Sequence, residues 1–527
     1  MMKRILILIL TLCLLSGCGA YEVTPPPEDT EATEATTTET TPTPTATEEE
    51  DTRIPPVYSE WEIDKPVYDL TVFNALYECE KGSLVNCSVD NAVGGYSGEG
   101  YVKGLMNPDS KLVVTANIPS NQHYSVIVCG YSETPATGTL YVDGLPRGKF
   151  TVGGAGEYEC VMFDNIYLEE GEVQITFASL TADIAFDYVA LQNCTTSYTK
   201  AYTFTAQLSN PKASEAASKL YRYICECFGD EVLTSAQVTQ GTNDEIQEIF
   251  YTTGRYPAIR FSDMMDYGVG LDSGDVEIAL EWAEQGGIVG YDWYWVKNGS
   301  CYSVKSDFDI TKCINDHDVA RLNEKRLKEL YESGGVTDET ISLLEDIDRV
   351  AEQLTKLKEA DVAVLFRPLP EASSGEFWWG DSLEGYKWLY ELIYARLCDY
   401  HHLDNLIWIW NGQSADWYVG DDLCDIIGLD IYDFSGALWD NQSHINQLIN
   451  VTNMCNHKPI AITECNVLPS PSLLSIDHAF WSFATTWSGS TLDKEGQLST
   501  KYMSEDEWVL FYNCSLTQTR DELGRIK

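Results

Sequence analysis

Two glutamates follow apolar runs and carry side chains that could cleave a sugar polymer. Glu371 comes shortly after the run Val362-Ala-Val-Leu-Phe366, and the other glutamate ends the run Pro459-Ile-Ala-Ile-Thr-Glu464. Each run predicts a buried strand that delivers a carboxyl group to one end. One carboxylic acid can protonate a glycosidic oxygen while a second carboxylate attacks the anomeric carbon. We therefore predict that Glu371 and Glu464 are the catalytic pair of a glycosidase.

The C-terminal part of the chain, residues 206–527, alternates apolar runs with helical patterns. Eight such units predict a (β/α)8 TIM barrel, whose active site opens at the C-terminal ends of the strands. Glu371 and Glu464 would end the fourth and seventh strands and meet in one mouth. The insertion 296–344 follows the third strand and could wall the cleft. The predicted strands are Val232–Val238, Pro257–Asp263, Gly287–Trp295, Val362–Glu371, Asn405–Asn411, Asp425–Tyr432, Pro459–Glu464 and Phe480–Trp487.

Residues 67–195 have a different pattern, in which short runs of Val, Ile, Tyr and Phe lie between Gly, Asn, Asp and Pro turns. Two of these runs are 111–116 and 173–177. Such spacing predicts a second domain ahead of the barrel, an all-β sandwich of the jelly-roll kind. Cys129 falls on an apolar run of this domain, where we expect its thiol to act as a small hydrophobe.

The first 18 residues have the pattern of a bacterial export signal. Lys3 and Arg4 precede an apolar run, 5–15, that is too short to span a bilayer, and Leu15-Ser-Gly-Cys18 is similar to a lipobox. This predicts that Cys18 carries lipid and anchors an extracellular protein to the cell surface. A plain signal peptide is the alternative. Residues 19–60 are rich in Thr, Glu and Pro and predict a disordered tether.

The formal net charge of −48 narrows the class of partner. A polyanion would repel so acidic a chain, so we expect no nucleic acid partner and no membrane contact except through the lipid. The sequence contains no His-Glu-x-x-His and no paired Cys-x-x-Cys pattern, so catalysis is predicted to need no cofactor. A neutral polysaccharide fits this charge and the 14 tryptophans. We expect the protein to be a monomer.

The C-terminal domain resembles family 26 of the glycoside hydrolases, which belongs to clan A and is typified by endo-β-1,4-mannanases. The resemblance extends over residues 206–527. It rests on the motifs Leu208-Ser-Asn-Pro211, Tyr256-Pro-Ala-Ile259, Phe366-Arg-Pro368, Phe377-Trp-Trp-Gly380, Ile407-Trp-Ile-Trp-Asn411, Gly428-Leu-Asp-Ile-Tyr432 and Lys458-Pro-Ile-Ala-Ile-Thr-Glu464. It implies a retaining mechanism on β-mannan, with Glu371 as the acid/base and Glu464 as the nucleophile.

The resemblance also implies roles for residues around this pair. Tyr432 would donate a hydrogen bond to Glu464, and Trp487 would lie under the sugar that is cleaved. Arg367 would hold the carboxylates electrostatically. The other residues that the resemblance places against the substrate are Trp293, Tyr294, Trp378, Trp379 and Asn411.

Three positions depart from the pattern of the family. Pro370 stands where the family usually has His, and Tyr294 stands where it has a second His. Glu376 replaces an aromatic residue that would offer a stacking surface. Both carboxylates remain, so we predict cleavage of β-1,4-mannosidic bonds in mannan, glucomannan or galactomannan. The alternatives are another polymer, such as mixed-linkage β-glucan or β-1,3-xylan, and a non-hydrolytic surface lipoprotein that binds glycans.

The β-sandwich domain resembles a family 35 carbohydrate-binding module. The motifs are Tyr77-Glu-Cys-Glu80, Gly95-Tyr-Ser-Gly-Glu-Gly-Tyr-Val102 and Phe186-Asp-Tyr-Val189. The resemblance implies a structural calcium ion held by Glu78, Glu80 and Asp187, with the two glutamates on one face of a strand. It also implies sugar binding at Tyr96. Ala185 stands where such modules often have Asn, and a purely structural sandwich is the alternative.

Overall fold

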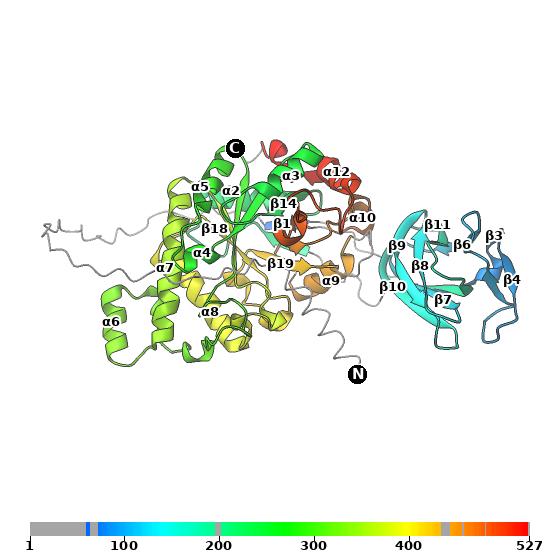
Figure 1. The fold of residues 1–527 in the computed structure, drawn as a ribbon, viewed down its shortest axis with the longest axis horizontal. Coiled ribbons are helices and arrows are strands. Elements are labelled where there is room, and N and C mark those ends of the chain that lie inside the picture. The colour runs from blue at the N-terminus through cyan, green and yellow to red at the C-terminus, as the bar shows by residue number, and fades with distance from the viewer. Residues whose placement is uncertain are drawn as a thin grey trace, which may run out of the picture. The chain divides into compact units, whose positions relative to one another are not determined.

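The computed structural model describes residues 60–63, 72–194, 202–433, 443–455, 458–479 and 481–524. They form an N-terminal all-β region and a C-terminal barrel of strands and helices (Figure 1). The predicted export signal 1–18, with Cys18, and all but the last residue of the predicted tether 19–60 lie outside the described residues. Within those residues, no helix combines the length and the apolar character needed to cross a bilayer.

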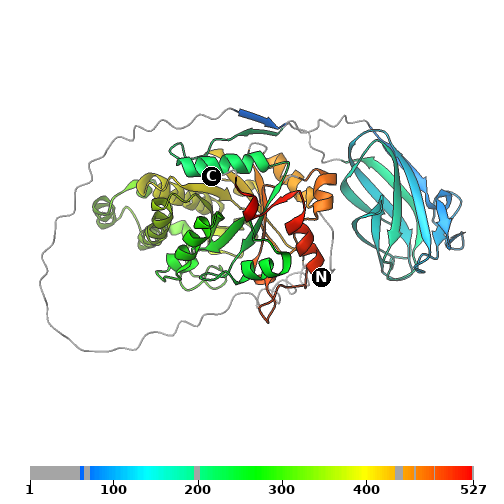
Figure 2. The same ribbon diagram turned by 90° about the horizontal axis from the view of Figure 1, so that it is seen from above.

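Eight parallel strands close into a barrel. Neighbouring strands pair in the order β15-β16-β17-β18-β19-β20-β21-β14, and β14 also pairs with β15, which closes the ring. Figure 2 shows helices around the outside of these strands. The predicted (β/α)8 fold is therefore confirmed. The strands are β14 (Val232–Gln237), β15 (Ile259–Asp263), β16 (Ile288–Trp293), β17 (Val364–Pro368), β18 (Leu406–Trp410), β19 (Ile426–Ile431), β20 (Ile460–Cys465), β21 (Phe483–Thr486) and, paired with β14 as an extension, β22 (Thr517–Gln518).

The barrel strands form where the sequence is apolar on both faces. β18 reads Leu-Ile-Trp-Ile-Trp and is buried along its whole length, as expected for a parallel strand that is covered on both faces. Several of the helices begin with a side-chain cap. At the start of α8, for example, the Ser382 hydroxyl accepts a hydrogen bond from the Gly385 N–H (3.1 Å). The helices are α2 (Glu215–Cys227), α3 (Asp244–Thr253), α4 (Met265–Gly268), α5 (Asp275–Glu284), α6 (Glu324–Glu332), α7 (Asp338–Glu359), α8 (Leu383–Ala395), α9 (Ile445–Met454), α10 (Pro471–Asp477), α11 (Ser488–Thr491) and α12 (Glu505–Asn513).

The all-β region consists of two antiparallel sheets around an apolar core. One sheet has the order β10-β7-β12-β5-β4, with β2 beside β12, and the other has the order β3-β6-β11-β8-β9. Along β6, Leu112, Val114, Ala116 and Ile118 are buried, and the residues between them are more exposed. The predicted antiparallel β fold of this region is confirmed. Its strands are β2 (Asn74–Glu78), β3 (Ser83–Val85), β4 (Ser88–Asp90), β5 (Tyr101–Lys103), β6 (Lys111–Ile118), β7 (Gln122–Tyr131), β8 (Ala136–Val142), β9 (Leu145–Val152), β10 (Glu159–Leu168), β11 (Gly171–Ala178) and β12 (Ala185–Asn193).

Two details of the all-β region differ from the expectations. Cys129 is not a hydrophobic thiol, because it forms a disulfide with Cys160 across the neighbouring strands β7 and β10. Glu80 does not share a strand with Glu78. β2 ends at Glu78, and Glu80 lies in the short 3-10 turn Cys79–Lys81.

The insertion 296–344 packs beside the segment that follows Glu371. A short β-bridge joins Tyr302 to Phe377. The base of the insertion is held by Lys297, whose ammonium group donates to Asp346 (2.6 Å), and each of these side chains is only 6% exposed. Outside the two main folds, β1 (Glu60–Ile63) pairs antiparallel with β13 (Tyr202–Thr205).

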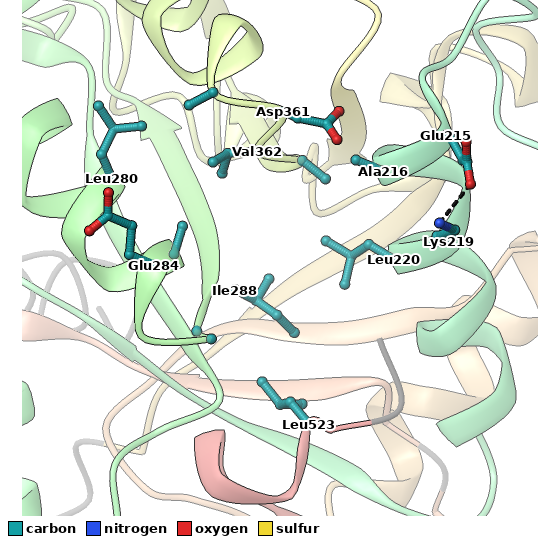
Figure 3. A pocket seen from close by; sticks show the side chains of 15 residues that line it. Glu215, Ala216, Lys219, Leu220, Leu280, Glu284, Ile288, Asp361, Val362 and Leu523 are labelled. Carbon is teal, nitrogen blue, oxygen red and sulfur yellow. Dashed lines mark ion pairs between the residues drawn. The ribbon is translucent and has the colours of Figure 1, made fainter. Parts of the chain in front are cut away.

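A cavity of about 520 Å³ lies at the N-terminal ends of the barrel strands (Figure 3). It is lined by Ile288 at the start of β16 and by Val362 just before β17. Charged side chains also line it. They are the Asp361 carboxylate and an ion pair between Glu215 and Lys219 (2.6 Å). This cavity is at the opposite end of the strands from Glu464, so it is separate from the predicted catalytic pair.

Candidate active site

Glu371 lies on a tight turn just beyond β17. The strand ends at Pro368, and not at Glu371 as predicted. Leu369 and Glu371 both have positive φ values, of 54° and 52°, a conformation that strains residues with a side chain. The Glu371 N–H donates to the Asn411 carbonyl oxygen (2.7 Å), which holds the turn in place. A strained, well-anchored turn thus sets the direction of this carboxyl group.

Glu464 lies within β20, beside an irregularity in the strand pairing. Leu429 is opposite Ile462, but the next residue, Asp430, is opposite Glu464. Thr463 is therefore an extra residue on β20, as in a β-bulge, and such bulges redirect the side chains next to them. The bulge brings Glu464, which is 2% exposed, beside Asp430.

Three carboxyl groups meet at the C-terminal end of the barrel. One oxygen atom from each of Glu371, Asp430 and Glu464 lies within 4.8 Å of the others. Retaining glycosidases hold their two carboxyl groups about 5–5.5 Å apart, whereas inverting enzymes need about 6.5–9.5 Å to admit a water molecule. The spacing of Glu371 and Glu464 therefore suits attack by a carboxylate.

Arg367 is surrounded by carboxylates and is completely buried. Its guanidinium group donates to Asp292 (2.6 Å), to Asp430 (2.8 Å) and to Glu464. Burial acts to lower the pKa of Arg367, but the attraction of these three carboxylates outweighs it and raises the pKa well above its usual value. The arginine therefore stays charged and supplies positive charge to a cluster of acids.

The two oxygen atoms of Glu464 accept hydrogen bonds from different donors. Oε1 accepts from Arg367, from the Tyr294 hydroxyl (2.9 Å) and from the Gln237 amide (3.3 Å). Oε2 accepts from the Tyr432 hydroxyl. One oxygen is thus held by three donors and the other by one.

Glu371 has the environment of a general acid. Burial, reinforced by the negative charge of Glu464, raises the pKa of Glu371 to about 6. Burial also raises the pKa of Asp292 to about 6, although Arg367 opposes this shift. General acids work best when their pKa lies near the operating pH. Glu371 can therefore hold a proton to donate, while Glu464 faces a permanent positive charge.

Asn411 was predicted to line the cleft, but it is buried and connects the Glu371 turn to β19 and β20. Its amide group donates to Asp430 (2.8 Å) and to Thr463 (2.6 Å). Its side-chain oxygen accepts from the Glu371 N–H (3.1 Å). Because Asn411 is 0% exposed, its role in the structure is to position the Glu371 turn.

Trp487 and Trp379 adjoin the carboxyl cluster. Trp487 directly follows β21 and meets the Tyr432 ring edge to face, with centroids 5.7 Å apart. Trp379 is fully buried and stacks on Phe377 at 4.6 Å, and its Nε1 donates to the Pro370 carbonyl oxygen (2.9 Å). Contrary to the prediction, Trp379 therefore does not line the cleft but supports the Glu371 turn, whereas Trp487 lies next to a donor of the Glu464 carboxylate.

Trp293 and Trp378 do not line the cleft, contrary to the prediction. Both side chains are 0% exposed. Side chains alternate along β16, so Asp292 and Tyr294 face the carboxyl cluster while Trp293 faces α4. Trp293 stacks on Trp295 at 4.2 Å, and the Trp378 Nε1 donates to the Trp295 carbonyl oxygen (2.7 Å). Both indoles are core residues.

Three polar residues of the cluster were not predicted: Asp292, Asp430 and Gln237. Asp292 precedes Tyr294 by two positions, and Asp430 precedes Tyr432 by two positions. Because side chains repeat every two residues along a strand, counting back from each tyrosine would have found both aspartates. Gln237 gives no such signal, because it ends the first barrel strand outside every recognised motif.

In the all-β region, Ser97 connects two of the predicted calcium ligands. Its hydroxyl lies 2.7 Å from Glu78 Oε2 and 3.2 Å from Asp187 Oδ1, and its N–H donates to Asp187 (2.9 Å). Burial raises the pKa of Asp187, with a further contribution from the charges of Glu78 and Glu80. Tyr96 is partly exposed and meets Tyr101 edge to face (6.0 Å), so the predicted sugar-contacting ring is adjacent to Ser97 in the chain.

Glu80 completes the set of carboxylates. Its Oε1 accepts from the Glu99 N–H (2.9 Å), and its buried Oε2 has no hydrogen-bond partner in the described part of the chain. An unsatisfied hard oxygen beside two other carboxylates is the donor chemistry that calcium prefers. Glu78, Glu80 and Asp187 thus have the oxygen ligands that calcium prefers. Among the described residues, however, the acidic side chains whose oxygens converge within 4.8 Å of one another are Glu371, Asp430 and Glu464 of the barrel.

The sequence model of glycosyl hydrolase family 26 matches residues 209–518. A mannan endo-1,4-beta-mannosidase of Thermothelomyces thermophilus is 29% identical over 468 residues, which is 85% of this chain and 90% of that protein. Mannan endo-1,4-beta-mannosidase A of Piromyces sp is 26% identical over 474 residues, or 85% of this chain and 72% of that protein. The solved structure of a Podospora anserina GH26-CBM35 beta-(1,4)-mannanase has a TM-score of 0.58 at 26% identity and spans 86% of this chain and 99% of its own.

Proposed function

Because this chain belongs to glycosyl hydrolase family 26, we propose that it is a retaining endo-hydrolase of β-1,4-mannosidic bonds in mannan, glucomannan or galactomannan. The names of its relatives support this substrate. The observation that carries the proposal is the pairing of Glu371 with Glu464. Their oxygens lie within 4.8 Å, one carboxyl group has a pKa raised to about 6, and the other faces Arg367.

In the first step, Glu371 donates its proton to the glycosidic oxygen while Glu464 attacks the anomeric carbon. The bond to the leaving sugar chain breaks, and the remaining sugar becomes ester-linked to Glu464. In the second step, Glu371 takes a proton from water, and the water oxygen replaces Glu464 at the anomeric carbon. Two inversions give a product with the original configuration. We assign Trp487 as the floor under the cleaved sugar because it lies beside Tyr432 at the end of β21.

The all-β region is proposed to bind carbohydrate, with Tyr96 at the contact and calcium held by Glu78, Glu80 and Asp187. Two observations support this assignment: the unsatisfied Glu80 oxygen and the similarity to the Podospora anserina GH26-CBM35 mannanase, whose name gives it two modules. The sequence of residues 1–18 supports a further proposal, in which lipid on Cys18 anchors the enzyme to the outer face of a bacterial cell. We propose that it acts there as a monomer.

The function is tested by the release of reducing ends by a soluble form, residues 51–527. The substrates are galactomannan, glucomannan, mixed-linkage β-glucan and β-1,3-xylan, and Glu464→Ala is the matched control. We expect activity on both mannans, with retained β configuration by NMR, and no turnover by Glu464→Ala because the nucleophile is gone.

Activity confined to another polymer would contradict the mannan assignment, and it would locate the change in specificity at Pro370, Tyr294 and Glu376. If the parent protein and Glu464→Ala both bind a glycan without turnover, the protein is a glycan-capture protein and not a hydrolase.

A further inference from the structure

Tyr294 makes its contact with Glu464 in a setting that fixes the phenol. The hydroxyl donates to Glu464 Oε1 (2.9 Å). The ring packs near those of Phe377 and Trp379, with centroid distances of 5.4 Å and 6.4 Å. The Tyr294 N–H faces the Asp263 carboxylate (3.4 Å). Burial, followed by the charge of Glu464, raises the pKa of Tyr294 well above its usual value, so the phenol remains a neutral donor at working pH.

The unequal sharing of donors distinguishes the two oxygens of Glu464. Oε1 accepts from Arg367, Tyr294 and Gln237, and a carboxylate oxygen has about two lone-pair sites for such bonds. Oε1 therefore has no lone pair left to attack a carbon atom. Oε2 accepts only from Tyr432 among the described hydrogen bonds, so one of its lone pairs remains available.

We propose that Tyr294 is a positioning residue that makes Oε2 of Glu464 the attacking atom and stabilises Glu464 as the leaving group when the glycosyl-enzyme is hydrolysed. This inference rests on the proposed retaining mechanism. In the first step the bond from Oε2 to the anomeric carbon forms and the glycosidic bond breaks, with the proton of Glu371 going to the leaving oxygen. In the second step a water oxygen bonds to the anomeric carbon, the bond to Oε2 breaks, and the proton of water goes to Glu371.

The charge on Oε1 changes in opposite directions in the two steps. Oε1 begins as part of an anion, becomes a neutral ester carbonyl in the intermediate, and regains negative charge when Glu464 leaves. Hydrogen bonds to charged acceptors are stronger than those to neutral ones. The Tyr294 hydroxyl therefore stabilises the second transition state relative to the intermediate, and its loss slows the second step more than the first.

The test compares Tyr294→Phe with the parent protein on 2,4-dinitrophenyl β-mannobioside, whose good leaving group makes the first step fast. We expect kcat to fall roughly 10-fold or more, by the loss of one hydrogen bond to a charged group. KM should fall in parallel, so that kcat/KM changes much less. A pre-steady-state burst of dinitrophenol should appear, and mass spectrometry should find a mannobiosyl adduct on the peptide that contains Glu464.

Two further variants separate positioning from simple loss of structure. Tyr294→His places a different donor at the same position and is expected to restore part of the lost kcat. Tyr291→Phe removes a buried phenol from β16, the strand that Tyr294 follows, and this phenol donates to Asp275 (2.7 Å) away from the carboxyl cluster. It should lower the melting temperature and leave kcat, KM and the burst unchanged.

The inference fails if Tyr294→Phe, folded by circular dichroism, raises KM at constant kcat, because Tyr294 would then be a substrate contact. It also fails if kcat and kcat/KM fall equally with no burst. A parent protein that turns over neither the aryl glycoside nor any polymer would instead overturn the proposed function, and this inference with it.

Discussion

At the scale of single residues, the proposed acid and nucleophile are distinguished by their surroundings. Both are glutamates, and Glu464 is buried while Glu371 is partly exposed. Glu371 sits on a backbone turn, and burial followed by the charge of Glu464 raises its pKa more than Arg367 lowers it. Glu464 faces Arg367 and two phenols. The same side chain can thus take two roles because Arg367 donates directly to Glu464, whereas burial and a neighbouring negative charge dominate at Glu371.

The pH dependence of activity follows from Glu371. A general acid must be protonated, and its pKa of about 6 lies above the usual value for glutamate. We therefore expect kcat/KM to fall as the pH rises through about 6, since the free enzyme then loses the proton that it must donate.

The cause of this shift is tested separately by following the Glu371 carboxyl carbon by NMR in Glu464→Gln. Removing the neighbouring negative charge should move the pKa of Glu371 downward. An unchanged pKa in this variant would contradict the electrostatic explanation.

At the scale of elements, β16 serves two layers of the barrel. Asp292, and Tyr294 just beyond the strand end, face the carboxyl cluster. Tyr291 faces outward and donates to Asp275, the first residue of α5 (2.7 Å). Asp275 also forms an ion pair with Arg260 on β15 (2.6 Å), and both side chains are completely buried. This ion pair ties α5 to the strands that carry the site.

Asp275→Ala should destabilise the barrel, because it leaves the guanidinium of Arg260 buried without a counter-charge. Removing one partner of a buried ion pair typically lowers the free energy of unfolding by about 3–5 kcal/mol. Urea denaturation measures this change. The control is Lys219→Ala, which removes an exposed ion pair of α2 and should leave the midpoint unchanged. Equal changes in the free energy of unfolding for the two substitutions would contradict a stabilising role of the buried ion pair.

At the scale of the whole molecule, the all-β region and the barrel have separate apolar cores. The core of the all-β region draws on residues 79–191, and the clusters of the barrel draw on residues 206–523. No residue belongs to both sets. Two separate apolar cores are our reason for expecting more than one cooperative unfolding unit.

Calorimetry should therefore resolve two unfolding transitions. Calcium should raise the midpoint temperature of only the transition that belongs to the all-β region. An ion that binds the folded state alone stabilises it in proportion to the logarithm of its concentration. Glu80→Gln removes a charged ligand and should abolish the calcium effect while leaving the barrel transition and the hydrolysis of soluble mannan unchanged. A single transition that does not respond to calcium would contradict both expectations.

The sequence by itself determined the architecture and the order of its parts. Eight apolar runs predicted all eight barrel strands, because parallel strands are covered on both faces and show this in their composition. Alternating short runs predicted the antiparallel region for a similar reason. Glu464 could be named because it ends such a run within a recognisable motif, and Glu371 because it comes shortly after such a run, between two motifs. These are local patterns, so they can be read along the chain.

Only the tertiary structure decided which residues surround that pair. Asp292, Asp430 and Gln237 come from three different strands, and their convergence depends on barrel closure and on the bulge at Thr463. Because side chains alternate along a strand, Trp293 points into the core, whereas the neighbouring Tyr294 contacts Glu464. Contacts of this kind depend on register and side-chain direction, which the composition of a single segment does not specify.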